Sequence, residues 1–376
     1  MKNIYMTFLW RPIRRLIRTL ALTTLLANAA NAVSQSPFSR SLMINELEVV
    51  NDLRSQNDGV WSFSHLLKTL APTNTILEDY LTDWILEWRS TPSNENTPQP
   101  RPQTIKDLWT KDSLGRLIAS RSPFRLLAVI HRPDLRTQLN PAGEGRFVFG
   151  LFNPKSQLLM PLTIIFEYRL PDSLSPQKWA SKLRDLGLSP YNQDFKQKLE
   201  QMTRIWARPE NLLSVRSNQL IGTHHWELRN FSRDSTGFLR SQFLPRSPAL
   251  IFNDPNSNSP LKNWILDNQS AIRNGQYNLP NQFLSFASLI PDENFQWLKN
   301  QDLPEDVRKS FAMQTCNGCH AGESGTRFLH LNPRKLFEAS RPSTYLISEL
   351  ATRIHAAESM FRGELKTLPL KSCRVH

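Results

Sequence analysis

GEGRFVFGLFNPKSQLLMPLTIIFEYRLP, residues 143–171, contains two apolar runs separated by the turn-forming segment NPKSQ. Runs that are rich in aromatic and β-branched residues and bounded by Asn, Pro and Ser are typical of β-strands. The short connection predicts an antiparallel hairpin with strands over 143–152 and 158–171. FRLLAVIHRPDLR, residues 124–136, contains a continuous apolar run and predicts a further buried strand.

A second hairpin is expected farther along the chain. HHWELRNF, residues 224–231, and GFLRSQFL, residues 237–244, flank the turn-forming SRDST. Between the two hairpins, residues 175–189 and 194–208 have the apolar periodicity of helices. Antiparallel hairpins in blocks that alternate with helices predict an α+β fold with flanking helices.

Changes in composition divide the rest of the chain. Residues 33–89 are expected to form an N-terminal helical segment, and residues 90–103, with four prolines among polar residues, predict an exposed linker or loop. We assign residues 104–300 to a central α+β region and residues 301–376 to a C-terminal helical region.

Two helices are expected in the C-terminal region. LPEDVRKSFAMQ, residues 303–314, has a proline and two acidic residues suited to a first turn, and this helix is expected to run straight into Cys316. STYLISELATRIHAAESMF, residues 343–361, predicts a second helix with apolar side chains near one face, namely Leu346, Leu350, Ile354 and Phe361.

Residues 1–32 have the features of a signal peptide. Five basic residues precede or border a short apolar run from Thr19 to Ala30, and Ala30, Asn31 and Ala32 form a small-x-small cleavage site. The run is shorter than the ~20 residues that a membrane-spanning helix needs. We therefore expect a cleaved signal, a periplasmic or extracellular protein, and no membrane span after cleavage.

Charge and motifs narrow the classes of function. The chain carries a formal net charge of +13, and removal of the five basic residues in 1–32 lowers it to +8. The remaining basic residues are dispersed, so no nucleic-acid partner is expected. The sequence has no Walker A, H-E-x-x-H or G-x-S-x-G motif, so common nucleotide and hydrolase chemistry has no signature.

QTCNGCHAGESG, residues 314–325, contains a C-x-x-C-H motif at Cys316, Cys319 and His320. Two thiols at this spacing can form thioethers with one haem, and the adjacent histidine is then held as the proximal iron ligand. Gly318 allows the tight turn within the motif. Export agrees with this interpretation, because haem c is attached after export in bacteria. The sequence therefore predicts one covalent haem c on Cys316 and Cys319, with His320 on the iron.

Two other arrangements of these residues stay open. Exported cysteines commonly form disulfides, and Cys316 or Cys319 could pair with each other or with Cys373. Any such pairing leaves one odd thiol. A zinc site could use Cys316, Cys319, His320 and His330 as ligands, although adjacent residues rarely serve one tetrahedral metal.

The distal side of a bound haem has several candidate ligands. Met360 lies 40 residues after His320 on a predicted helix, and His330 and His355 are its competitors. An open distal position is a further option. Met360 taken alone is expected in the core rather than on iron. For a haem enzyme, His355 and Arg353 are the candidate acid–base pair.

The second hairpin carries a row of polar residues. Alternation along its first strand places His225, Glu227 and Arg229 on one face. Such a row could bind a ligand, but an exposed strand face is the ordinary interpretation. The opposite face carries His224, Trp226 and Leu228.

Five segments in order resemble a group of uncharacterised secreted bacterial proteins: FRLLAVIHRPDLR, GEGRFVFGLF, IIFEYRLP, WELRNF and FAMQTCNGCHAGESGTRFLHLNPR. The resemblance covers roughly residues 105–350, and members of the group carry a β-rich centre and one late C-x-x-C-H. It implies roles only for Cys316, Cys319 and His320, which are similar to c-type cytochrome haem-attachment residues. Only 56 residues follow His320, so upstream segments are expected to help enclose a haem.

These features together predict an exported haem c-binding protein that takes part in electron transfer or redox chemistry, with a redox protein as its expected partner. The alternative is a secreted, non-haem binding or structural protein whose cysteines form a disulfide or a metal clip. The length of the chain leaves room for a substrate domain, but the sequence indicates no substrate pocket, so an electron carrier is favoured over a haem enzyme.

Overall fold

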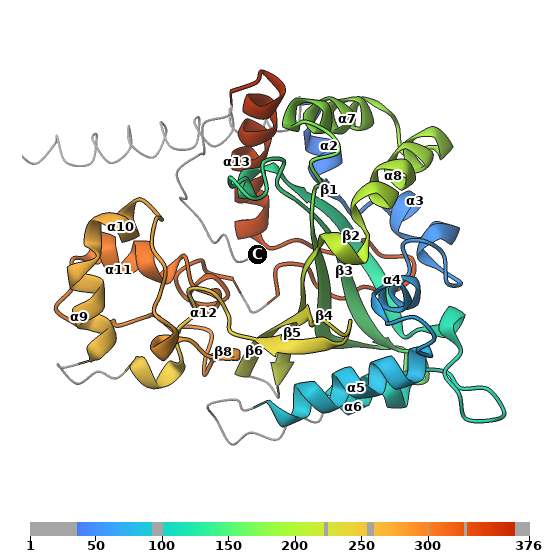
Figure 1. Ribbon diagram of the computed structural model, residues 1–376, viewed down its shortest axis with the longest axis horizontal. Coiled ribbons are helices and arrows are strands. Elements are labelled where there is room, and N and C mark those ends of the chain that lie inside the picture. Colours follow the sequence, from blue (N-terminus) through green and yellow to red (C-terminus); the bar gives the residue numbers. More distant parts are fainter. Residues whose placement is uncertain are drawn as a thin grey trace, which may run out of the picture.

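An antiparallel β-sheet of eight strands forms the centre of the protein, with helices packed on it and beside it (Figure 1). The α+β class predicted from the sequence is confirmed, and the sheet is larger than the two predicted hairpins. The predicted signal peptide and Cys373 lie outside the described residues. The computed structural model describes residues 36–91, 101–221, 225–253, 259–299, 301–326 and 329–364.

Seven of the strands lie in chain order, each antiparallel to the next, and β8 pairs with β6. The two predicted hairpins are β3–β4 and β6–β7, and β5 lies between them. The strands are β1 (Met43–Ile44), β2 (Phe124–Arg132), β3 (Glu144–Asn153), β4 (Leu158–Arg169), β5 (Leu212–Ile221), β6 (His225–Arg233), β7 (Leu239–Gln242) and β8 (Ala287–Ile290).

Helices fall into an N-terminal set, a pair between β4 and β5, and a C-terminal set. The predicted linker, residues 90–103, is helical at its two ends, where α5 ends and α6 begins. Residues 92–100 of this linker lie outside the described part. The first two sets are α2 (Ser39–Leu42), α3 (Leu47–Val50), α4 (Phe63–Leu70), α5 (Leu77–Ser90), α6 (Arg101–Leu108), α7 (Pro176–Leu188) and α8 (Gln193–Trp206). The third set is α9 (Pro260–Asp267), α10 (Gln269–Arg273), α11 (Glu305–Ala312), α12 (Cys316–Cys319) and α13 (Thr344–Phe361).

One face of the sheet is apolar and is covered by the first two sets of helices. Side chains alternate along β3, so Phe147 and Phe149 enter this core while Arg146 and Val148 face the other side. Phe63 on α4 packs edge-on against Phe149, with ring centres 5.5 Å apart. The C-terminal part of the chain therefore packs on the second face of the sheet, the one that carries Arg146 and Val148.

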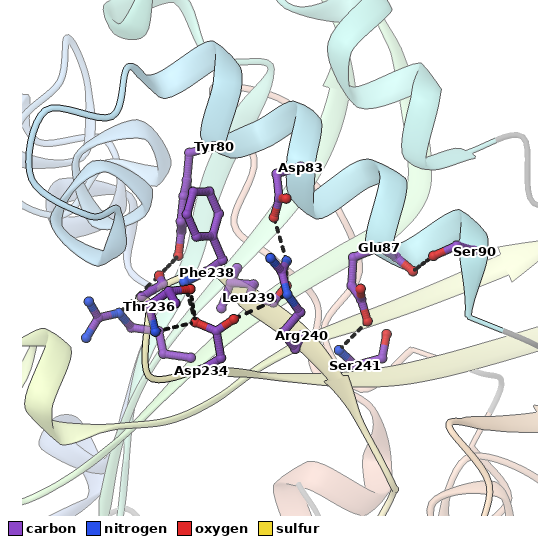
Figure 2. A network of polar contacts seen from close by, with 12 residues as sticks. Tyr80, Asp83, Glu87, Ser90, Asp234, Thr236, Phe238, Leu239, Arg240 and Ser241 are labelled. Atoms are coloured by element: carbon purple, nitrogen blue, oxygen red, sulfur yellow. Dashed lines mark hydrogen bonds and ion pairs between the residues drawn. The ribbon is translucent and has the colours of Figure 1, made fainter.

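Figure 2 shows the hydrogen bonds and ion pairs between α5 and the β6–β7 hairpin. The Tyr80 hydroxyl donates to the carbonyl oxygen of Gly237 at 3.1 Å. Arg240 on β7 forms ion pairs with Asp83 on α5, at 2.6 Å, and with Asp234 in the turn, at 3.3 Å. These contacts hold the helix across the end of the sheet, where a short edge strand would otherwise be exposed.

Helices α9–α12 and strand β8, residues 260–319, form a smaller body that we call the α9–α12 lobe (Figure 1). Its apolar core includes Phe311, Trp297 and both motif cysteines, and it also takes in Trp226 and Leu228 from β6. Because β8 pairs with β6, the lobe and the sheet share one strand.

Helix α13 returns from the lobe to the N-terminal half and packs against α2 and α7 (Figure 1). Its predicted apolar face is largely buried, with Leu346, Leu350 and Ile354 all below 9% exposed, whereas Phe361 is 39% exposed. Within the parts of the chain that the structure describes, none of the helices combines the length and apolar character that a bilayer span requires.

Candidate functional site

The C-x-x-C-H motif forms its own short helix, α12. Helix α11 ends at Ala312, so the predicted continuous helix into Cys316 is interrupted by a turn. Thr315 causes the restart, because its hydroxyl accepts a hydrogen bond from the backbone N–H of Gly318 at 3.0 Å. The same hydroxyl donates to the carbonyl oxygen of Ala312 at 2.8 Å. The motif is thus oriented by a capped turn.

Gly318 is needed here for space. A Cβ atom at this position would overlap the carbonyl oxygen of Ala312 and lie 2.8 Å from the hydroxyl oxygen of Thr315. The backbone of Gly318 is in α12, so the requirement comes from the close approach of α11 and α12. The sequence analysis explained Gly318 by a tight turn, whereas the structure explains it by this close contact.

The lobe holds α12 through buried hydrogen bonds. Asn317 accepts from the indole N–H of Trp297 at 2.7 Å and donates to the carbonyl oxygen of Leu289 on β8 at 3.3 Å. The backbone N–H of Cys316 donates to the hydroxyl of Ser247 at 2.8 Å. Three separate segments therefore fix the motif.

Cys316 and Cys319 are both reduced thiols and both fully buried. The Cys319 sulfur lies 3.6 Å from Nε2 of His330. Among the described residues, no group of three or more His, Cys, Asp or Glu side chains is arranged to hold a metal ion.

The imidazole of His320 is enclosed by aromatic rings. It stacks on Trp226 of β6, with ring centres 4.4 Å apart and planes 22° apart, and the ring of His330 lies 4.3 Å away. His330 is held by Ser343, whose hydroxyl lies 3.0 Å from Nδ1. Burial, with His320 and Arg353 nearby, holds the pKa of His330 well below its usual value, so it is neutral at neutral pH.

A cleft lies between the second face of the sheet and the first half of α13, and His320 and His330 lie on its wall. Its apolar lining includes Ile130 and Val148 from the sheet and Leu346 from α13. The charged residues on its wall are Arg132, Arg146, Glu349 and Arg353.

Two of the three arginines in the cleft are neutralised by carboxylates. Arg132 forms an ion pair with Asp134 at 2.7 Å, and Arg146 forms one with Glu167 at 3.0 Å. Burial would raise the pKa of Asp134, but the charge of Arg132 lowers it to about 2. Burial, together with repulsion from Arg132, lowers the pKa of Arg353 to about 9, which still leaves Arg353 charged at neutral pH.

The structure brings His330 to the motif but places Met360 elsewhere. Met360 is fully buried in the core shared by α13, α2 and α7. It lies seven residues beyond Arg353, which is about 10 Å along a helix. His355 is an exposed residue of α13. Of the three distal candidates, His330 is therefore the one that lies beside His320.

Two residues of the polar row on β6, Glu227 and Arg229, are buried, so the expectation of an exposed strand face is wrong for them. Glu227 and Arg229 are 0% and 1% exposed, and they form an ion pair at 2.9 Å. Arg229 also donates to the carbonyl oxygens of Trp88 and Thr91 at the end of α5. The row closes the C-terminal end of that helix, and His224 lies outside the described residues.

The donor set fits a c-type haem, whereas Cys316 and Cys319 are fully buried and do not line the cleft. Two thiols and one imidazole lie within a single turn, and His320 borders the cleft. The rings of His320 and His330 are too close to bind one iron from opposite sides, because two bonds of about 2 Å would separate the ring centres by about 6 Å. Haem binding therefore requires His330 to move away from His320.

Sequence reasoning missed Trp226 as a partner of His320, and it missed the charged cleft. A signal for the cleft was present, since Arg146 and Glu167 interrupt apolar runs that predict buried strands. Comparisons of the chain with protein-family models, with curated proteins and with solved structures find no match.

Proposed function

We propose that this protein is an exported haem c-binding protein that takes part in electron transfer or redox chemistry. The observation that supports it is the placement of Cys316, Cys319 and His320 on one capped turn, with His320 on the wall of the cleft. A redox protein is its proposed partner, and residues 1–32 are its proposed export signal.

In this proposal Cys316 and Cys319 hold the porphyrin by thioether bonds and His320 is the proximal ligand. A bound haem would supply one-electron chemistry at its iron. Trp226 fixes the plane of the His320 ring by stacking, and the burial of His320 limits the access of water to that ring. His330 is the proposed distal candidate in place of Met360, because it already lies beside the motif.

The test is expression of the full chain with the haem-c maturation machinery, followed by intact mass and visible spectroscopy. We expect a covalent mass increase of one haem, which is lost in the double variant Cys316→Ser/Cys319→Ser. His320→Ala is expected to keep the covalent haem but to change the spectrum of the iron. A folded, colourless wild-type protein would refute the proposal.

A colourless protein would support the alternative function, a secreted non-haem binding or structural protein. Peptide mapping without reduction then separates its two forms. A disulfide at Cys316 or Cys319 identifies a covalent staple, and metal retained by the 3.6 Å pair of Cys319 and His330 identifies a metal clip.

Carbon monoxide binding separates a carrier from an enzyme. A closed electron carrier has two protein ligands on iron, so its reduced form is expected to bind carbon monoxide poorly. His330→Ala should then increase that binding, whereas the exposed variant His355→Ala should leave it unchanged. Ready binding by the wild type supports a haem enzyme with an open distal side.

A further inference from the structure

Arg353 is a buried cation whose side-chain donors are partly unfilled within the described part of the chain. It is 3% exposed on α13 and lines the cleft, and its Nε and Nη1 atoms have no hydrogen-bond partner among the described residues. An arginine stays charged at neutral pH, and a buried charge is normally paired or hydrogen-bonded. Its unfilled donors therefore point to a ligand that supplies acceptor oxygens.

The neighbouring carboxylates do not supply acceptor oxygens to these donors of Arg353. Arg132 and Arg146 repel Arg353, and their own carboxylate partners, Asp134 and Glu167, are held in ion pairs with them, although Asp134 also attracts Arg353. Glu349 lies one turn before Arg353 at the rim of the cleft, where it is partly exposed. The charge of Glu349 raises the pKa of Arg353, but burial and the charge of Arg132 have larger effects and lower it.

The rest of the wall indicates the body of the ligand. The same wall also carries apolar side chains of one cluster, including Ile130, Ile165 and Leu331, beside the arginines. A molecule that satisfies both kinds of side chain has a carboxylate at one end and an apolar body at the other. Guanidinium groups favour carboxylates because their N–H groups match the spacing of two oxygens.

We propose that Arg353 anchors a carboxylate-binding site, in which an apolar organic acid occupies the cleft between the sheet and α13. The carboxylate has two conceivable sources, a free acid from solution or the propionate of a haem attached at Cys316 and Cys319. The second source rests on the proposed function above, and the first does not.

The test on haem-free protein compares benzoate with benzamide, its uncharged isostere. We expect benzoate to raise the thermal midpoint of the full chain by several degrees and benzamide to leave it unchanged. Arg353→Met should lose the benzoate response, and Arg353→Lys should weaken apparent affinity at least tenfold. The matched control is Arg362→Met on an exposed residue at the end of the same helix, which should keep the full response.

A second readout concerns stability without ligand. Because Arg353 is a buried cation with partly unfilled donors, Arg353→Met is expected to melt at the same temperature as the wild type or higher. A purely structural arginine would give the opposite sign. The proposal is overturned if benzoate and benzamide act alike, or if the benzoate shift survives in both Arg353 variants.

The haem-loaded protein identifies the source of the carboxylate. If loading abolishes the benzoate response of the wild type, the propionate occupies Arg353. If the response persists after loading, the ligand is a free acid. Should no haem attach at all, the proposed function fails, while the benzoate experiment still decides the role of Arg353.

Discussion

Replacement of Arg229 by methionine tests whether the buried polar row on β6 is structural. Arg229 makes four hydrogen bonds, two to Glu227 and one each to the carbonyl oxygens of Trp88 and Thr91. The methionine keeps the volume but leaves the Glu227 carboxylate, 0% exposed, without its cation. Breaking a buried pair from one side costs about 3–5 kcal/mol, so we expect a loss of that size in the free energy of unfolding.

Urea unfolding of four proteins measures this energy: the wild type, Arg229→Met, Glu227→Gln and the double variant. The double variant should lose less than the sum of the two single losses, with a coupling of about 2–3 kcal/mol. Arg362→Met removes an exposed ion pair to Glu364 and should have no measurable effect. A loss below about 1 kcal/mol for Arg229→Met, or no coupling, would show that the row is hydrated and not a buried pair.

Three further predictions concern the motif, the buried histidines and Met360. Gly318→Ala should lower the free energy of unfolding by about 1–3 kcal/mol, because the methyl group overlaps the carbonyl of Ala312; an unchanged urea midpoint would contradict this contact. Burial lowers the pKa of His131 to about 4, so the unfolded chain binds its proton first as pH falls, and stability should drop by about 2 kcal/mol between pH 7 and 5. His330 acts in the same direction, and His131→Gln should flatten the pH profile, whereas an unaltered slope would assign the effect elsewhere. Met360→Ala should cost about 2–5 kcal/mol as a core truncation while the haem spectrum stays unchanged; a changed spectrum would make Met360 a ligand.

The sequence predicts strands β2, β3, β4, β6 and β7, and it misses β1, β5 and β8. The runs that became β2, β3 and β4 are apolar for most of their length. Strand β5, LLSVRSNQLI, is paired on both sides but alternates apolar residues with Ser214, Arg216 and Asn218. These polar residues lie on the side of the cleft, so the hydrophobic pattern is too weak to indicate a strand.

The sequence predicted only the part of the candidate site whose residues are close together in the chain. Cys316, Cys319 and His320 follow one another in the chain, so their spacing alone indicates the chemistry. The contact between Trp226 and His320 depends on the pairing of β6 with β8, which no spacing in the sequence reveals. The sequence could not single out Arg353 either. Its unfilled donors depend on which carboxylates pair with the other arginines in the folded protein.

The burial of both thiols in the α9–α12 lobe has a consequence for the order of events during biogenesis. Cys316 and Cys319 have no exposed surface, and their lobe is completed by Trp226 and Leu228 from a strand of the main sheet. If a haem is attached at these sulfurs as proposed, the enzyme that attaches it needs the lobe open, so attachment would come before the lobe closes on β6. Chain that folds first would be locked in an unmodified form, and slower folding would raise the yield of modified protein.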